Sequence, residues 1–314
     1  MTTVADGLFQ YGGSPVGVMP PYTKLFATKN YGRAWFVNAN AASNGDGKSP
    51  AKAFTTMQRA FNNVASGDII YFEGKILEQL VTPVNVFDVT VVGTGNRPRH
   101  ADATPVGGGY TASQWGPPAS GAVSGQATVR VLQQGWRFVN ILFTMESATA
   151  AGVEIVRNAA SGDDERDASH CEVLGCRFAG AGVGVRLTAT SFTENPFNVL
   201  IQGNTFNGNT TSILAASAQP NMVQVLDNYF MSNTSAITAK FQASVIRGNF
   251  IGIFTAASNA GGIDVRSGGG NNVITQNFLS GTYSKAGGYN CETGDQWMGN
   301  IAALTGAWTE SDPA

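Results

Sequence analysis

Charge is scarce in this sequence. Only 13% of the 314 residues are charged, whereas soluble domains typically carry about 25%. The 19 Lys and Arg side chains are balanced by 21 Asp and Glu, which gives a formal net charge of −2. A protein without a basic excess has little means of neutralising a phosphate backbone, so we expect no nucleic-acid partner.

Long apolar runs and soft metal donors are also lacking. No run of 18 or more apolar residues occurs, so we expect no membrane insertion, and the first 25 residues do not resemble a secretory signal. The 3 cysteines and 2 histidines are too few for a typical zinc or copper site, and we expect neither a metal nor a cofactor. Because the cysteines are odd in number, reduced thiols that fill space are the simplest interpretation.

Glycine and asparagine, in contrast, are abundant. The chain contains 39 glycines and 25 asparagines, residue types that disfavour helices and favour turns. This composition indicates a β-rich, turn-dense protein. Residues 1–32 lack periodicity and are predicted to be an N-terminal attachment arm, while apolar residues at helical spacing predict a helix over about 53–65. Residues 95–127 are predicted to be a long loop, and 286–314 a C-terminal tail or cap.

A repeat begins near residue 128. Its clearest unit, residues 198–206, has the pattern apolar-x-apolar-x-Gly-Asn-x-Phe, and a second alternating strand follows most copies. Further copies lie at residues 131–138, 171–178, 223–230, 244–251 and 272–279. Repeats of 20–30 residues built from short strands predict a solenoid over residues 33–285, with a Gly- and Asn-rich β-sandwich as the alternative.

The corner position of the repeat carries asparagine. Residues Asn204, Asn228, Asn249 and Asn277 share this position, which Cys176 fills in an earlier copy. Asparagine tolerates left-handed backbone angles and can bond to its neighbours in adjacent coils. We therefore predict a column of stacked corner asparagines.

The repeat resembles the right-handed parallel β-helix proteins of the pectate-lyase-like superfamily. The opening segment, with Phe36-Val37-Asn38, Asn44-Gly45-Asp46-Gly47 and Gly67-Asp68-Ile69-Ile70-Tyr71, is similar to the first strands and capping helix of that superfamily. The resemblance implies an all-β right-handed parallel β-helix with an N-terminal capping helix. Its members include polysaccharide lyases, hydrolases and catalytically silent structural proteins, so the fold leaves the activity open.

Two short segments suggest where the protein functions. Residues 6–17 and 295–300 resemble parts of bacteriophage virion proteins that carry β-helix domains. This likeness implies a spike, fibre or capsid decoration protein, located in the virion and attached to a capsid or tail protein through its arm. The candidate attachment residues are Leu8, Phe9, Tyr11 and Pro15.

The predicted outward positions of the strands carry few carboxylates. One predicted column holds Glu154, Gly184 and Asp264, and its two carboxylates lie about four coil steps, roughly 19 Å, apart. The neighbouring predicted column carries Lys240 and Arg266, so we expect Arg266 beside Asp264 and Lys240 one coil away. Glycoside hydrolysis needs two carboxyl groups at about 5–10 Å. A hydrolase or lyase is therefore the alternative function, with Asp163, Asp164 and Asp264 as its candidate residues. An acidic run at residues 163–167 is most simply a solvated surface.

The first strand of the repeat places apolar side chains outward, which predicts an interface. We expect a homotrimer packed through Leu174, Leu200, Leu226, Val245 and Val273. Contact with a host surface polysaccharide is a further expectation, with Tyr110 and Trp115 as stacking candidates that could equally be packing aromatics. A host-secreted carbohydrate-binding or adhesin module is a third hypothesis. The leading one is a non-enzymatic virion protein.

Overall fold

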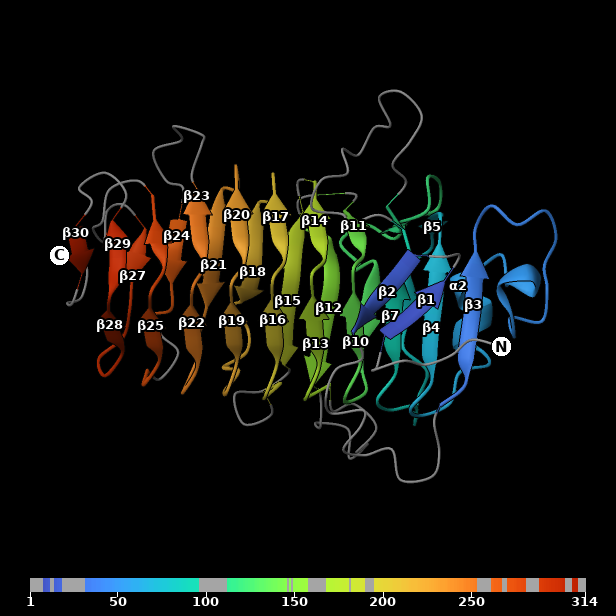
Figure 1. Cartoon of the computed structure of the whole chain (residues 1–314). Helices are drawn as coiled ribbons and strands as arrows, with labels where there is room; N and C mark the ends of the chain where they lie inside the picture. Colours follow the sequence, from blue (N-terminus) through green and yellow to red (C-terminus); the bar gives the residue numbers. More distant parts are fainter. Residues whose placement is uncertain are drawn as a thin grey trace.

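The chain folds into a long solenoid whose strands form three parallel sheets (Figure 1). The computed structural model describes residues 8–11, 14–18, 32–95, 112–145, 147, 149–157, 168–180, 182–189, 195–252, 261–266, 270–280, 288–302 and 307–309. From β4 to β27, each turn of the chain contributes one strand to each sheet in the same order, and this arrangement is a right-handed parallel β-helix. The predicted fold class is therefore confirmed.

The first and second sheets each contain 10 strands. In chain order, the first sheet is formed by β3 (Ala34–Asn38), β4 (Ile69–Glu73), β7 (Thr90–Gly93), β10 (Arg137–Val139), β13 (Glu172–Leu174), β16 (Leu200–Gln202), β19 (Gln224–Leu226), β22 (Val245–Arg247), β25 (Val273–Thr275) and β28 (Gln296–Met298). The second sheet is formed by β5 (Lys75–Leu77), β8 (Gln114–Gly116), β11 (Leu142–Thr144), β14 (Arg177–Ala179), β17 (Thr205–Asn207), β20 (Tyr229–Met231), β23 (Phe250–Gly252), β26 (Phe278–Leu279), β29 (Asn300–Ala302) and β30 (Ala307–Thr309).

The third sheet contains 8 strands. They are β6 (Leu80–Val81), β9 (Val129–Val131), β12 (Ala151–Arg157), β15 (Val183–Ala189), β18 (Thr211–Ala215), β21 (Ser235–Ala239), β24 (Gly261–Asp264) and β27 (Tyr289–Asn290). The sequence predicts two or three short strands per coil, and the structure has three. The unit at residues 198–206 in fact contains β16 and β17, which belong to different sheets and are separated by the Gly-Asn corner.

The earliest predicted copy of the repeat is out of phase. Residues 131–138 were expected to match 171–178, but Phe138 pairs with Val173 in the first sheet. Phe143 of the next strand is the residue that pairs with Phe178. The error arose because Gly135-Trp136 imitates a corner that actually lies at Asn140-Ile141, where Asn140 has a φ of 57°.

The left-handed corner residues are not the predicted ones. Between the first and second sheets, the positive φ falls on the residue before the asparagine, as at Gly203 (66°), Asp227 (55°) and Gly248 (68°). The corner asparagines themselves are 1% exposed. A second left-handed position recurs two residues before the strands of the first sheet, for example at Asn198 (52°) and Ala243 (46°).

The predicted column of asparagines is confirmed. Asn228 Nδ2 donates to Asn249 Oδ1 at 3.0 Å, and Asn249 Nδ2 donates to Asn277 Oδ1 at 2.9 Å. Each side chain also accepts the backbone N–H of the equivalent residue in the preceding coil, as Asn249 does from Asn228 at 2.9 Å. The ladder begins where Cys176 N donates to Asn204 Oδ1 and continues to Asn300.

A column of phenylalanines fills the core beside this ladder. The rings of Phe143, Phe178, Phe206 and Phe230 stack at centroid distances of 5.1, 5.0 and 4.9 Å and lie within 10° of parallel. Glycines face them from the third sheet, and a Cβ on Gly184 would lie 2.7 Å from the Phe206 ring. Ring stacking of this kind adds to the free energy gained by burying apolar area.

The N-terminal end carries the short 3-10 helix η1 (Pro50–Lys52) and the helix α2 (Met57–Phe61) (Figure 1). The predicted helix over 53–65 is thus shorter, at 5 residues. Distant acidic side chains hold this end together. Glu78 accepts the backbone N–H groups of Met57 and Gln58 at 2.9 and 2.8 Å, which satisfies free donors at the start of α2. None of the helices in the described part of the chain has the length and hydropathy to cross a bilayer.

The solenoid extends past residue 285, where the sequence predicts a tail or cap. Strands β27, β28 and β29 add one more strand to each sheet, and β30 then pairs antiparallel with β29. The predicted loop at 95–127 likewise includes a strand, β8, whose neighbours are β5 and β11.

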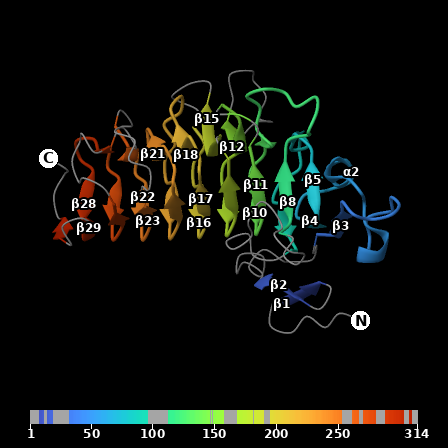
Figure 2. The ribbon, with the colours of Figure 1, turned by 90° about the horizontal axis from the view of Figure 1, so that it is seen from above.

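The described part of the N-terminal arm is a hairpin. Strand β1 (Leu8–Tyr11) pairs antiparallel with β2 (Ser14–Val18) in a two-stranded sheet of its own. Figure 2 shows this hairpin beside the N-terminal coils and outside the three sheets.

Candidate functional site

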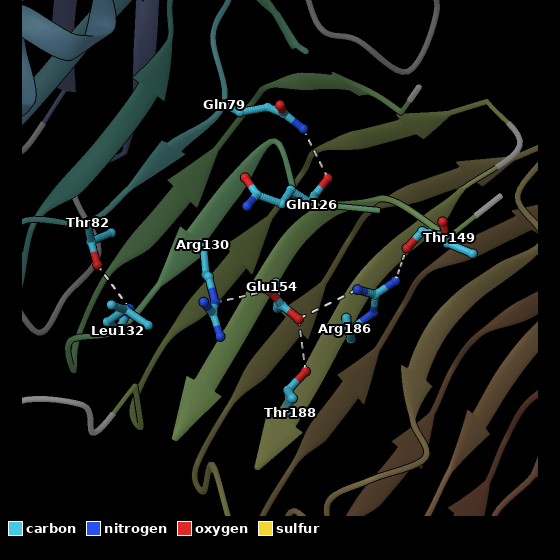
Figure 3. Close-up of polar contacts among 9 residues, drawn as sticks. All are labelled: Gln79, Thr82, Gln126, Arg130, Leu132, Thr149, Glu154, Arg186 and Thr188. Carbon is cyan, nitrogen blue, oxygen red and sulfur yellow. Dashed lines mark hydrogen bonds and ion pairs between the residues drawn. The ribbon is translucent and has the colours of Figure 1, made fainter. Parts of the chain in front are cut away.

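Three charged side chains form a row on the outer face of the third sheet (Figure 3). Register pairing places Arg130, Glu154 and Arg186 in successive coils. Glu154 Oε2 lies 3.2 Å from Arg130 Nε, and its Oε1 lies 3.5 Å from Arg186 Nη1. The Thr188 hydroxyl donates to Glu154 Oε1 at 3.2 Å, and Arg186 also donates to the carbonyl of Thr149. The row therefore joins neighbouring coils through a carboxylate that already has several donors.

The sequence-based columns on this sheet are wrong at one coil. Glu154 was expected beside Gly184, but it pairs with Arg186. A Cβ on Gly152 or Gly184 would meet a core phenylalanine, so these glycines face inward. Sequence reasoning also missed Arg130, because β9 was placed inside the out-of-phase copy of the repeat.

A shallow hollow lies further along the same sheet. It is lined by Ala215, Ala216, Thr238, Ala239, Lys240, Asp264 and Arg266. Asp264 continues the column of Glu154 through Arg186, Leu214 and Thr238. Asp264 accepts Arg266 Nε at 2.9 Å on one oxygen and Arg266 Nη2 at 2.6 Å on the other. These hydrogen bonds and the carboxylate charge raise the pKa of Arg266.

The predicted loose cluster of Lys240, Asp264 and Arg266 is thus brought together by the fold. Asp163 and Asp164, the other candidates for acid or base chemistry, lie outside the described residues. Asp264 and Glu154 are four coil steps apart, roughly 19 Å at the ordinary strand spacing. This spacing is too wide for a pair that shares one glycosidic bond.

The outer face of the first sheet mixes an ion pair with apolar side chains. Arg137 Nε lies 3.3 Å from Glu172 Oε1, and both side chains are 13% exposed. The outward columns predicted for this sheet agree with its register, so Leu200 follows Glu172, and Val245 precedes Val273. The five interface candidates, Leu174, Leu200, Leu226, Val245 and Val273, therefore share one face, on which Leu226 is 8% exposed.

An aromatic column on the second sheet was not foreseen. Tyr229, Phe250 and Phe278 follow one another on its outer face, and their rings stack at 4.7 Å. The signal was present in the sequence, because each of these residues directly follows a corner asparagine. The repeat pattern leaves the position after the asparagine undefined, so the aromatic column is not apparent from that pattern.

The proposed glycan contacts change in the structure. Trp115 has no exposed surface, and its indole Nε1 donates to the Glu78 carbonyl at 2.9 Å. Its ring packs against Phe61, Phe72, Phe138 and Phe143, so it is a packing residue rather than a stacking platform for a sugar. Tyr110 lies outside the described residues. Leu8, Phe9, Tyr11 and Pro15 lie on the β1–β2 hairpin.

None of the three cysteines forms a disulfide bond, which agrees with the predicted reduced thiols. Cys176 is buried, and burial raises the pKa of its thiol to about 12. Such a thiol is unreactive at neutral pH, because the thiolate is the reactive form.

Comparisons with solved structures find the same architecture in carbohydrate-active proteins. A pectin methylesterase from Aspergillus niger in penultimately deglycosylated form aligns with a TM-score of 0.53 and 15% identity, covering 91% of this chain and 90% of that one. The deglycosylated form gives 0.52 and 14%, covering 88% and 84%. Carrot pectin methylesterase gives 0.47 and 12%, covering 88% and 82%. At these identities the likeness establishes the fold alone. No curated protein matches the sequence.

The architecture defines a pectate-lyase-like parallel β-helix protein. Residues 126–300 match the profile of the family described as periplasmic copper-binding protein (NosD). These are 175 of the 314 residues, more than half, so the chain belongs to this family.

The described residues do not fit a copper ion. Copper prefers imidazole, thiolate and thioether donors. Cys171 and Cys176 are buried with their sulfurs against backbone carbonyls, and His170 Nδ1 is bonded to Asn198 Nδ2 at 2.7 Å. No group of three His, Cys, Asp or Glu side chains that could hold a metal occurs within the described ranges. We therefore derive no chemistry through copper for this chain.

Proposed function

We propose that this protein is a non-enzymatic β-helical structural protein of a bacteriophage virion: a spike, fibre or capsid decoration. The arm at residues 1–32 attaches it to a capsid or tail protein, and outward surfaces of the solenoid contact host glycans. The proposal is supported by the resemblance of residues 6–17 and 295–300 to virion proteins and by a hairpin in the arm that forms its own sheet.

The observation that carries the non-enzymatic part is the state of the outward carboxylates. Glu154, Glu172 and Asp264 each pair with an arginine. Each of these carboxylates is engaged by its arginine, and on the column of Asp264 the other carboxylate, Glu154, lies roughly 19 Å away, too far for a pair that shares one glycosidic bond. A rigid scaffold agrees better with this arrangement than a hydrolytic site does.

Particle association tests the attachment. The full chain and a variant lacking residues 1–32 are each mixed with phage particles that lack this protein, and the particles are separated on a density gradient. We expect the full chain to migrate with the particles and the shortened chain to stay at the top, with the same circular dichroism spectrum. Migration of the shortened chain with the particles, or absence of the full chain from them, would contradict the proposal.

Assembly through the first sheet is the second part. The apolar face containing Leu174, Leu200 and Val245 is proposed to pack against copies of itself in a homotrimer. Light scattering at micromolar concentration should give three times the chain mass, and Leu200→Asp should give the monomer mass. A monomer for the unaltered chain would refute this part alone.

A polysaccharide hydrolase or lyase is the second candidate, favoured by the hollow beside Asp264. Incubation with bacterial polysaccharides, followed by assays for reducing ends and unsaturated uronates, separates the two functions. Turnover that disappears in Asp264→Asn would establish the enzyme. We expect no turnover, because both oxygens of Asp264 are hydrogen-bonded to Arg266.

A further inference from the structure

The hollow on the third sheet combines small apolar side chains with a polar rim. Ala215, Ala216 and Ala239 line it together with Thr238, while Lys240, Asp264 and Arg266 supply the charged groups. Its lining spans the three successive coils of β18, β21 and β24, a distance of roughly 10 Å between the outer strands. We propose that this hollow is a binding site for one neutral pyranose unit of a glycan, recognised through two adjacent hydroxyl groups.

The Asp264–Arg266 pair supplies the recognition. Arg266 donates Nε and one Nη2 hydrogen to Asp264, which leaves three of the five guanidinium N–H donors directed elsewhere. Asp264 Oδ2 keeps one lone pair, because each carboxylate oxygen can accept two hydrogen bonds. A donor and an acceptor held side by side match a pair of neighbouring hydroxyls, one of which accepts while the other donates.

The pair is held ready for such a ligand. Its side chains are partly exposed, Asp264 at 25% and Arg266 at 56%, so both can reach a ligand. Asp264 also accepts the Arg266 backbone N–H at 3.2 Å, which fixes the carboxylate relative to the strand end. Little side-chain entropy remains to be lost on binding, and this favours affinity.

The surroundings favour a neutral sugar. Ala215 and Ala239 are buried in the core, whereas Ala216 is exposed, and its methyl group offers an apolar surface to the C–H face of a pyranose ring. The central carboxylate of Asp264 repels an acidic sugar, and Arg266 is already neutralised by it. The aromatic column of Tyr229, Phe250 and Phe278 is a poor alternative, because the faces of neighbouring rings cover one another at 4.7 Å.

This inference rests on the proposed contact with glycans and supplies its site. Three neutral polysaccharides (dextran, mannan and arabinogalactan) and the acidic polygalacturonate are immobilised, and binding of the full chain is measured by interferometry. A second set is first oxidised with periodate, which cleaves the bond between carbons that bear adjacent hydroxyls. We expect at least one neutral polymer to bind, with a loss of about tenfold or more after oxidation.

Variants locate the site. Ala216→Phe fills the hollow and Asp264→Asn removes the charged acceptor, and each should weaken binding by about tenfold. Arg130→Ala, on the same sheet but outside the hollow, is the matched control and should bind like the unaltered chain. Circular dichroism checks that each variant is folded, and Ala216→Leu replaces Ala216→Phe if the latter is not.

Several outcomes overturn the inference: no neutral polymer binds, oxidation has no effect, or Ala216→Phe and Asp264→Asn bind normally. Preference for polygalacturonate with equal weakening by Arg130→Ala would indicate general attraction to a basic face instead. None of these results affects migration with phage particles, so the attachment proposal stands or falls separately.

Discussion

The N-terminal and C-terminal coils have the same backbone fold but are stabilised by different interactions. In the C-terminal coils the same residue types recur, with asparagines bonded in a ladder from Asn204 to Asn300. Among the described residues of the N-terminal coils no such ladder runs. Large rings of unlike shape pack there at varied angles, from 17° between Trp35 and Phe54 to 79° between Phe61 and Trp115. Repetition stabilises one region, and irregular packing stabilises the other.

Removing a buried tryptophan ring from the N-terminal coils should have the largest effect. Trp115→Ala deletes a fully buried side chain and leaves the Glu78 carbonyl without the indole donor. We expect the free energy of unfolding to fall by about 3–5 kcal/mol, measured by chemical denaturation. Trp115→Phe, which keeps a ring but not the donor, should lose less.

Hydrogen exchange then tests whether the two regions unfold independently. Solenoid stability is approximately a sum over coils and their interfaces, so Trp115→Ala should speed exchange mainly in β5, β8 and β11. The amides of β19 and β22 should keep their protection. A uniform loss of protection over both regions would show that the coils unfold as one unit.

These two regions also explain what the sequence could predict. The ladder was predictable because asparagine recurs at one position of the repeat, where its side chain can bond to the next coil. The same repeat predicted the solenoid. The N-terminal coils were not, because Trp136 and Phe138 occupy places that repeat no pattern, and Gly135 imitated a corner. The position of Trp115 depends on rings from α2, β4, β10 and β11. The local periodicity of the sequence around Trp115 cannot predict these distant contacts.

The candidate site was likewise predictable in its regular part and not elsewhere. The sequence placed Lys240, Asp264 and Arg266 close together because their strands lie in the regular region. It failed at Glu154, where inward-facing Gly152 and Gly184 shift the outward positions by two residues. The alternation of apolar and polar side chains predicts which residues of a strand face inward. Glycine has no side chain and therefore gives no such signal.

Interrupting the ladder is the corresponding test of the C-terminal coils. Asn249→Ala removes donors to Val225 O and Asn277 Oδ1, together with the acceptor for Asn228. Buried groups left without partners cost about 1–3 kcal/mol each, and we expect a total loss of about 2–4 kcal/mol after relaxation. Asn207→Ala, at an outward position of β17, should change stability by less than about 0.5 kcal/mol in the same denaturation assay. Equal losses in the two variants would show that the ladder contributes no special stability.

Extending the ladder should have a smaller effect of opposite sign. Cys176 occupies the asparagine position, and its sulfur lies 3.4 Å from the Phe138 carbonyl. The amide of Cys176→Asn would donate there, as Asn204 does to Val173 at 2.9 Å, and its oxygen would accept the Ile141 N–H that now faces the sulfur. We expect a gain of about 1 kcal/mol in unfolding free energy. Cys176→Ser, which is too short for both bonds, is the control, and a loss in Cys176→Asn larger than in Cys176→Ser would show that this coil lacks room for the amide.

The smallest effect is expected at a corner that the ladder does not reach. Ala243 has a φ of 46°, a left-handed conformation that is costly for a residue with a Cβ, and Asn198 and Asn271 occupy the same corner in other coils. Ala243→Asn should therefore raise the free energy of unfolding by about 0.5 kcal/mol, because asparagine tolerates this conformation better than alanine. Ala216→Gly has no positive φ to relieve and should instead lose about 0.5–1 kcal/mol through the greater entropy of its unfolded chain. If both substitutions destabilised the protein equally, backbone strain at the corners would be negligible, and the coils would be held by the ladder and the core alone.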